Sequence, residues 1–256
     1  MESMPSPFLT AEWRSLAMLN YEIDPSVLQP FVPMGTELDQ WEGKTFVSMV
    51  GFMFLNTRIS GFTVPFHSNF EEVNLRFYVR RFTNEGWRRG VIFIKELVPR
   101  RAIAWTARVF YNENYIAVPM SHDLQIDATG AVRRASYHWV FNGRKNRLEI
   151  RIKGEGAIVL PGTREEFITE HYWGYARQRD GGTVEYQVEH PRWRVWPAQE
   201  ETLDCQVESL YGKTFSAFLQ QAPSSAFLAD GSPVTVFKGT RLASGINPIL
   251  TVQRPG

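Results

Sequence analysis

The sequence predicts a mainly β or α+β fold contained in one domain. Three observations predict it: several segments alternate apolar and polar residues, the helical signals are few and short, and no Pro/Gly/Ser-rich linker divides the chain. The chain has 256 residues, and β-rich barrels and sandwiches often use roughly 200–250 residues as a single domain.

Period-two alternation marks the strands. Segment 72–80 is the clearest, because its odd-numbered residues, such as Val73 and Leu75, are apolar and its even-numbered residues are polar. Segment 147–153 repeats this pattern. Further strands are predicted at 45–55, 90–98, 135–141, 183–189 and 234–238. The tripeptide Asp180-Gly181-Gly182 is typical of a hairpin turn.

Helical signals are short and rest mainly on capping residues. Helices are expected after Asp24, after Pro99, after Thr163 and near 205–218. In the first, Asp24 is a suitable N-cap and proline follows it at the first helical position. In the third, Thr163 and Glu166 form a capping-box pattern.

Charge and cysteine content exclude several protein classes. The formal net charge is +1, so the chain lacks the broad basic field that nucleic acids or anionic membranes attract. Cys205 is the only cysteine, which excludes an intrachain disulfide and a multi-cysteine metal cluster and fits a reducing cytoplasm. The first residues lack the features of a secretory signal, and no apolar run reaches the roughly 20 residues of a membrane span. We therefore expect a cytoplasmic protein without nucleic-acid or membrane partners.

The motifs of the common cofactor and hydrolase classes are missing. There is no Walker loop, no GxGxxG, no HExxH and no GxSxG, and the five histidines show no metal-ligand spacing. We expect no catalytic metal and no cofactor.

Arg76 is the best candidate for binding an anion. On the inside of a curved sheet, its guanidinium would need a carboxylate partner from the protein or from a ligand. The alternative is that the polar face of segment 72–80 is simply solvent-exposed.

Lys95 is a second candidate. Alternation places it in register with Val91 and Phe93, on a face with bulky apolar residues. A desolvated lysine has a lowered pKa and can act as a base or a Schiff-base nucleophile, whereas the alternative is a lysine that reaches solvent or pairs with a carboxylate.

Glu170 and His171 form a third group, beside Tyr172. One of the two can line a pocket as an acid–base group, or both can fix a strand end by hydrogen bonding.

The chain resembles the YqjF-like family of bacterial proteins of unknown function. The resemblance rests on segments 72–79, 107–120, 169–193 and 231–239, spread over roughly residues 8–242. It implies the acetoacetate decarboxylase-like fold, a curved and largely antiparallel β-barrel around a small-molecule cavity, with a few short outer helices. It also implies one domain over 8–242 and flexible termini at 1–7 and 243–256.

The resemblance also bears on chemistry. Acetoacetate decarboxylases use a lysine Schiff base next to a second lysine, whereas the similar stretch here places Met120 and Ser121 at those positions. We expect a cavity that binds a small carboxylate or carbonyl metabolite without Schiff-base decarboxylation. Arg76 would contact the anion, with Tyr78, Tyr115, Glu170 and His171 as lining or acid–base groups. The alternative is a non-catalytic binding or protein-interaction module. The sequence leaves open whether the chain forms a homo-oligomer.

Overall fold

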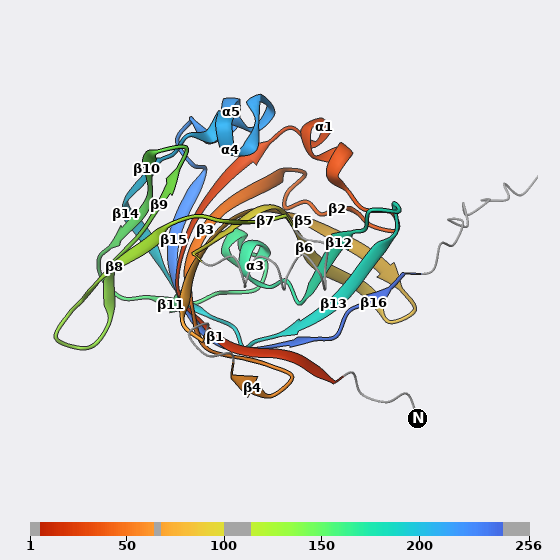
Figure 1. Ribbon diagram of the computed structural model, residues 1–256, viewed down its shortest axis with the longest axis horizontal. Helices are drawn as coiled ribbons and strands as arrows, with labels where there is room; N and C mark the ends of the chain where they lie inside the picture. The colour runs from red at the N-terminus through yellow and green to blue at the C-terminus, as the bar shows by residue number, and fades with distance from the viewer. Residues whose placement is uncertain (1–5, 64–67, 100–113, 243–256) are drawn as a thin grey trace, which may run out of the picture.

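Long, mostly antiparallel strands dominate the fold (Figure 1). The computed structural model describes residues 6–63, 68–99 and 114–242. Its strands are β1 (Pro7–Ile23), β2 (Glu37–Leu38), β3 (Thr45–Ile59), β4 (Phe62–Thr63), β5 (Phe70–Thr83), β6 (Gly86–Val98), β7 (Tyr115–Ala117), β8 (Met120–Ile126), β9 (Val132–Phe141), β10 (Arg144–Ile152), β11 (Ala157–Ile158), β12 (Trp173–Arg177), β13 (Thr183–Glu189), β14 (Arg194–Asp204), β15 (Ser225–Phe237) and β16 (Thr240–Arg241). Its helices are α1 (Pro25–Leu28), the 3-10 turn η1 (Gln29–Phe31), α3 (Arg164–Thr169), α4 (Val207–Tyr211) and α5 (Lys213–Leu219).

Seven strands form a ring of hydrogen-bonded neighbours. The order is β13-β12-β6-β5-β3-β1-β15, and β15 pairs in turn with β13. Two junctions of this ring are short. At one of them, β12 and β6 are parallel and pair through Trp173 with Gly90 and Gly174 with Val91. Gly90 is required there, because a Cβ would lie 2.7 Å from the Trp173 carbonyl oxygen and 2.6 Å from the Tyr175 ring.

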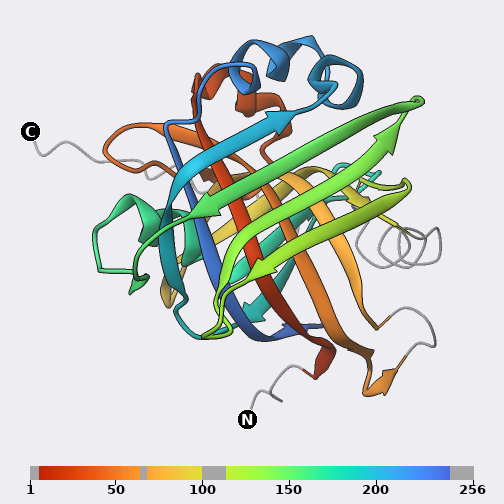
Figure 2. The same ribbon diagram turned by 90° about the vertical axis from the view of Figure 1, so that its left-hand side faces the viewer.

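The two faces of the ring pack against different cores. On the outer face, β8, β9, β10 and β14 form a second layer that crosses β1 and β3 (Figure 2). A large apolar core fills the space between these layers and continues under α4 and α5. The inner face holds a second core, to which α3 contributes Phe167 and Ile168. Figures 1 and 2 together show α3 lying across one end of the ring, while α1, α4 and α5 lie outside it.

Strand β5 separates the two cores. Val73, Leu75 and Phe77 belong to the outer core, whereas Tyr78 belongs to the inner one. The predicted alternation is therefore confirmed, but the solvent alternative for the polar face is wrong, since Glu72, Asn74 and Arg76 are all buried. Their side chains point into the ring, which makes the inner face of β5 the starting point for a functional site.

Most elements predicted from local signals are present. Five of the seven predicted strands fall within observed ones, and the other two, 147–153 and 234–238, extend one residue past the ends of β10 and β15. The hairpin turn at Asp180 joins β12 to β13. The Asp24 side chain caps α1, and the Thr163 side chain accepts from the Glu166 amide at the start of α3. The region 205–218 holds two short helices instead of one. The helix predicted after Pro99 and most of the two termini lie outside the described residues.

Candidate functional site

Arg76 lies inside the ring without a counter-ion. The residue is 8% exposed, its Nη2 donates to the Ile168 carbonyl oxygen at 3.4 Å, and its Nε has no hydrogen-bond partner. Within the described ranges, no carboxylate oxygen comes within 4.0 Å of the guanidinium. A buried charge normally has a partner, because desolvation costs several kcal/mol per ion. Arg76 is therefore a buried cation without an ion pair among the described residues.

His171 lies next to this cation, just beyond the end of α3. Its ring stacks on Tyr78 with centroids 4.6 Å apart and meets Phe167 edge-on at 5.6 Å. Tyr78 also contacts the Arg76 guanidinium, whose carbon lies 5.8 Å from the phenol ring centroid. Burial lowers the pKa of His171 to about 4, and the charges of Arg89 and Arg76 act in the same direction. The imidazole is therefore neutral at pH 7.

Asp39 and Arg89 form an ion pair behind His171. Arg89 Nε donates to Asp39 Oδ2 at 2.7 Å, and the same carboxylate oxygen lies 3.7 Å from His171 Nε2. Arg89 and His171 together hold the pKa of Asp39 at about 2, against the opposing effect of burial. On its other side the pair borders a cavity of about 250 Å³, which is lined by Asp39, Gln40, Trp41, Arg80, Trp87, Arg89, Gly162, Thr163, Glu166 and Phe167.

Tyr78 is fixed by a buried hydrogen-bond chain. Its hydroxyl lies 2.5 Å from Ser48 Oγ, and Ser48 donates to Asn20 Oδ1 at 2.6 Å. Because the Ser48 hydroxyl proton points to Asn20, the Tyr78 hydroxyl is the donor in the first of these bonds. The phenol ring, which contacts both Arg76 and His171, is thus held in one orientation.

Tyr115 lies farther along the same inner face. It belongs to the inner core, and its hydroxyl lies 3.5 Å from Glu72 Oε2. Asn74 donates to the other oxygen of Glu72 at 2.9 Å. Of the residues predicted from sequence, the structure thus brings Arg76, Tyr78 and His171 together and places Tyr115 near Glu72.

Glu170 points away from its neighbour His171. It accepts hydrogen bonds from the Tyr172 hydroxyl and from Thr169, and Arg192 lies 3.5 Å away. Burial and the Glu170 carboxylate raise the pKa of Tyr172 to about 12. These contacts are those of a carboxylate that fixes the end of α3.

Lys95 lies on the outer face of the ring. The prediction that it shares a face with Val91 and Phe93 is therefore wrong. The register between β5 and β6 shifts, so that Leu75 opposes Lys95 while Arg76 opposes Phe93. The extra residue, Ile94, moves Lys95 to the face opposite Val91 and Phe93. There its Nζ donates to the Leu210 carbonyl oxygen of α4. Burial lowers the pKa of Lys95, but the side chain lies on the opposite face of the sheet from Arg76.

Met120 also belongs to the outer side. It begins β8, pairs with Trp139 of β9 and packs against the outer core. Neither Lys95 nor Met120 therefore contributes to the cluster around Arg76.

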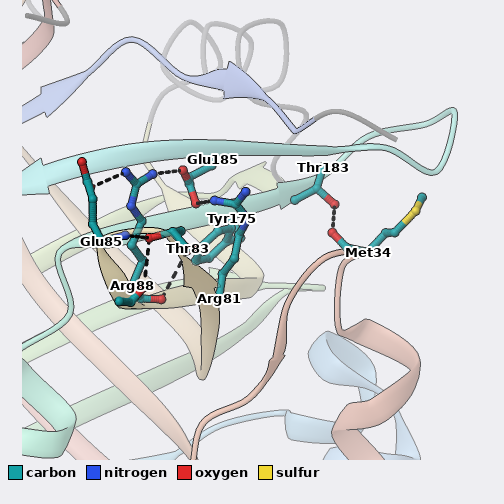
Figure 3. Close-up of polar contacts among 9 residues, drawn as sticks. Met34, Arg81, Thr83, Glu85, Arg88, Tyr175, Thr183 and Glu185 are labelled. Atoms are coloured by element: carbon teal, nitrogen blue, oxygen red, sulfur yellow. Dashed lines mark hydrogen bonds and ion pairs between the residues drawn. The ribbon is translucent and has the colours of Figure 1, made fainter. Parts of the chain in front are cut away.

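A separate cluster on β5, β6 and β13 shows how this protein pairs its other buried charges. Glu185 is almost fully buried, and it accepts from Arg88 at 2.6 Å and from Arg81 at 3.2 Å (Figure 3). Arg88 also bonds Glu85 and lies over the Trp173 ring. Each of these arginines has a carboxylate, in contrast to Arg76.

Sequence reasoning missed Asp39, Arg89, Ser48 and Asn20. No local pattern distinguishes these residues, and only the tertiary fold brings them together around Tyr78 and His171. The part of the chain that the structure describes holds no group of three or more metal-ligating side chains. Nor does it contain a helix with the length and hydropathy of a membrane span.

Comparison with known proteins agrees with this architecture. The curated relative "Uncharacterized protein YqjF" of Bacillus subtilis (strain 168) is 28% identical over 209 residues, which is 79% of this chain and 81% of the relative. Two solved structures share the fold at low identity. The enduracididine biosynthesis enzyme MppR complexed with pyruvate has a TM-score of 0.66 at 13% identity, over 94% of this chain and 91% of the other. An acetoacetate decarboxylase from Legionella pneumophila subsp. pneumophila str. Philadelphia 1 has a TM-score of 0.63 at 14% identity, over 94% and 93%.

These likenesses establish an acetoacetate decarboxylase-like fold, as the sequence resemblance implied. The family DUF2071, described as "Uncharacterized conserved protein (COG2071)", matches residues 10–233. The chain belongs to this family of uncharacterised conserved proteins.

Proposed function

We propose that the interior of the ring binds a small carboxylate or oxo-acid metabolite through Arg76. The observation that carries this proposal is the guanidinium that is buried inside the ring without an ion pair to any carboxylate of the described residues. Arginine matches a carboxylate with two parallel N–H···O bonds, and a charge-assisted bond of this kind is among the strongest in proteins. An anionic ligand would compensate the charge that the protein leaves unpaired.

The walls of the interior suit a small ligand with one charged end. Phe46, Phe167 and Val91 belong to the inner core around Tyr78, and the buried polar groups Arg76 and His171 lie next to it. A mostly apolar cavity with a small number of convergent polar groups is the usual design of a small-molecule site. MppR, which shares the fold, is complexed with pyruvate in its solved structure.

The chemistry we propose does not use a lysine Schiff base. All six lysines lie in the described ranges, and five of them are exposed. The sixth, Lys95, is bonded to α4 on the outer face of the ring. A carbonyl bound next to Arg76 would therefore meet no lysine amine.

Thermal-shift measurements test this function. Pyruvate, 2-oxobutyrate and benzoate are the carboxylate probes, and pyruvamide is the neutral control. A ligand at about 100 times its Kd stabilises by about 2.7 kcal/mol, which for this size of chain is roughly 5–10 °C in Tm. We expect such a shift for at least one carboxylate and none for pyruvamide.

Two variants locate the binding. Arg76→Gln should lose the shift, whereas Arg151→Gln should keep it, because Arg151 is an exposed arginine of β10 that pairs with Glu200. No shift with any carboxylate, or an equal shift in Arg76→Gln, would refute the proposal.

The interaction-module alternative has less support. The large apolar side chains that are exposed are spread over β4, the β5–β6 hairpin, β8 and β11, with Phe62, Phe82 and Ile126 as examples. A docking surface would need these groups to be contiguous.

A further inference from the structure

His171 is a second buried group inside the ring without hydrogen-bond partners. Its side chain is 2% exposed, its Nε2 lies 3.7 Å from Asp39 Oδ2, and neither Nδ1 nor Nε2 makes a hydrogen bond with a described residue. A buried polar group without a hydrogen bond costs roughly 1–3 kcal/mol, so such an imidazole next to an unpaired guanidinium needs an explanation. One ligand that reaches both groups would provide it.

The charges that face His171 come from several elements. Arg76 lies on β5 beside Tyr78, Arg89 lies on β6, and Asp39 follows β2. The remaining titratable neighbours are Glu170, which turns toward Arg192, and His190, which faces the main chain of His171. The neutral His171 ring is thus surrounded by the two guanidinium groups of Arg76 and Arg89 and by the one carboxylate of Asp39. These three groups carry a net charge of one positive unit.

The distance between Arg76 and His171 limits the ligand. The Arg76 guanidinium carbon lies 5.8 Å and the His171 ring 4.6 Å from the same Tyr78 ring centroid, so the two are at most about 10 Å apart. A hydrogen bond at each end takes about 2.9 Å. A ligand that reaches both groups is therefore no longer than a short-chain oxo acid.

We propose that His171 donates a hydrogen bond to the carbonyl oxygen of a 2-oxo acid whose carboxylate lies on Arg76, and that at acidic pH the ring does so as an imidazolium. This inference rests on the proposed function and narrows it, because it names the second ligand contact and the class of ligand. It also makes binding proton-linked at acidic pH, since the neutral ring of the free protein there takes up a proton when the ligand enters.

The direction of this linkage follows from the site. In the free protein, burial and the two arginines lower the pKa of His171 to about 4. A bound carboxylate cancels the charge of Arg76, and the hydrogen bond to the carbonyl favours the charged ring, which together should raise the pKa by about two units. Affinity should then increase as pH falls below about 6 and should be constant at higher pH.

Calorimetric titration tests the linkage in the whole protein. Pyruvate is titrated at pH 5.5 in bis-Tris and in piperazine, two amine buffers that carry no anion to compete for Arg76. The difference in heat between the buffers gives the proton uptake, which should be about 0.7 per site, and the affinity should be about fourfold higher than at pH 7.5. Propionate, which lacks the oxo group, should bind more weakly and with less proton uptake.

Two histidine variants complete the test. His171→Gln should abolish proton uptake and the preference for pyruvate over propionate, whereas His122→Gln, an exposed residue paired with Glu71, should change neither. Equal binding of pyruvate and propionate without proton uptake would overturn this inference and leave the carboxylate site intact. Absence of binding by both acids would overturn the carboxylate site itself. The wild-type titration decides between these outcomes even if His171→Gln fails to fold.

Discussion

Replacing Arg76 by methionine should stabilise the ligand-free protein. The arginine contributes only one weak hydrogen bond, at 3.4 Å to Ile168, and a contact with the Tyr78 ring. Each of these is worth roughly 0.5–1 kcal/mol. Desolvation of the unpaired cation opposes these contributions, and complete desolvation costs several kcal/mol. The cost is smaller here because Arg76 keeps some exposure. Methionine fills similar volume without charge.

The balance predicts a gain of about 1–2 kcal/mol, or roughly 2–8 °C in Tm for a chain of this size. Differential scanning calorimetry in an amine buffer without added carboxylate measures it. The matched control is Arg88→Met, which removes a half-buried arginine that pairs with the buried Glu185 and should lower Tm. If Arg76→Met lowers Tm as much as Arg88→Met does, Arg76 is satisfied by the protein, and the reasoning for a ligand fails.

Four further outcomes follow from the same contacts. Glu185→Gln should lower the free energy of unfolding by about 3 kcal/mol in urea titrations, because two arginines lose their shared carboxylate (Figure 3); an effect under 1 kcal/mol would contradict this. Gly90→Ala should cost at least about 2 kcal/mol by the same assay, since its Cβ would collide with the Trp173 carbonyl and the Tyr175 ring. Thr163→Ala should cost about 1 kcal/mol by removing the N-cap of α3, whereas Thr163→Ser should be nearly neutral. The folded-state pKa of His171, about 4, is below its unfolded value of about 6.5, so stability should fall by about 2 kcal/mol from pH 7 to pH 5 through this group; His171→Gln should show a correspondingly smaller loss.

Local signals predicted the elements well, because they depend on neighbouring residues. Alternation in β5 and the capping residue Thr163 of α3 are properties of short segments, and both predictions are confirmed. Strands β1 and β14 were missed. In β1, residues 15–21 are buried on both faces, so Leu16, Ala17, Met18 and Leu19 show no alternation to detect.

The site was predictable only in part. Arg76 and Tyr78 follow from the alternation of one strand, and His171 from its place after a helix. Lys95 was assigned to the wrong face because a single inserted residue, Ile94, reverses the alternation, and no local signal marks the insertion. Asp39 and Arg89 are 50 residues apart in sequence and meet only through the pairing of β2, β5 and β6.

A crystal structure of the protein grown in excess pyruvate tests the central claim most directly. We predict a carboxylate inside the ring with its oxygens about 2.8 Å from the Arg76 guanidinium, and the oxo group directed toward His171. An interior without ligand at saturating pyruvate, or a carboxylate bound away from Arg76, would contradict the account.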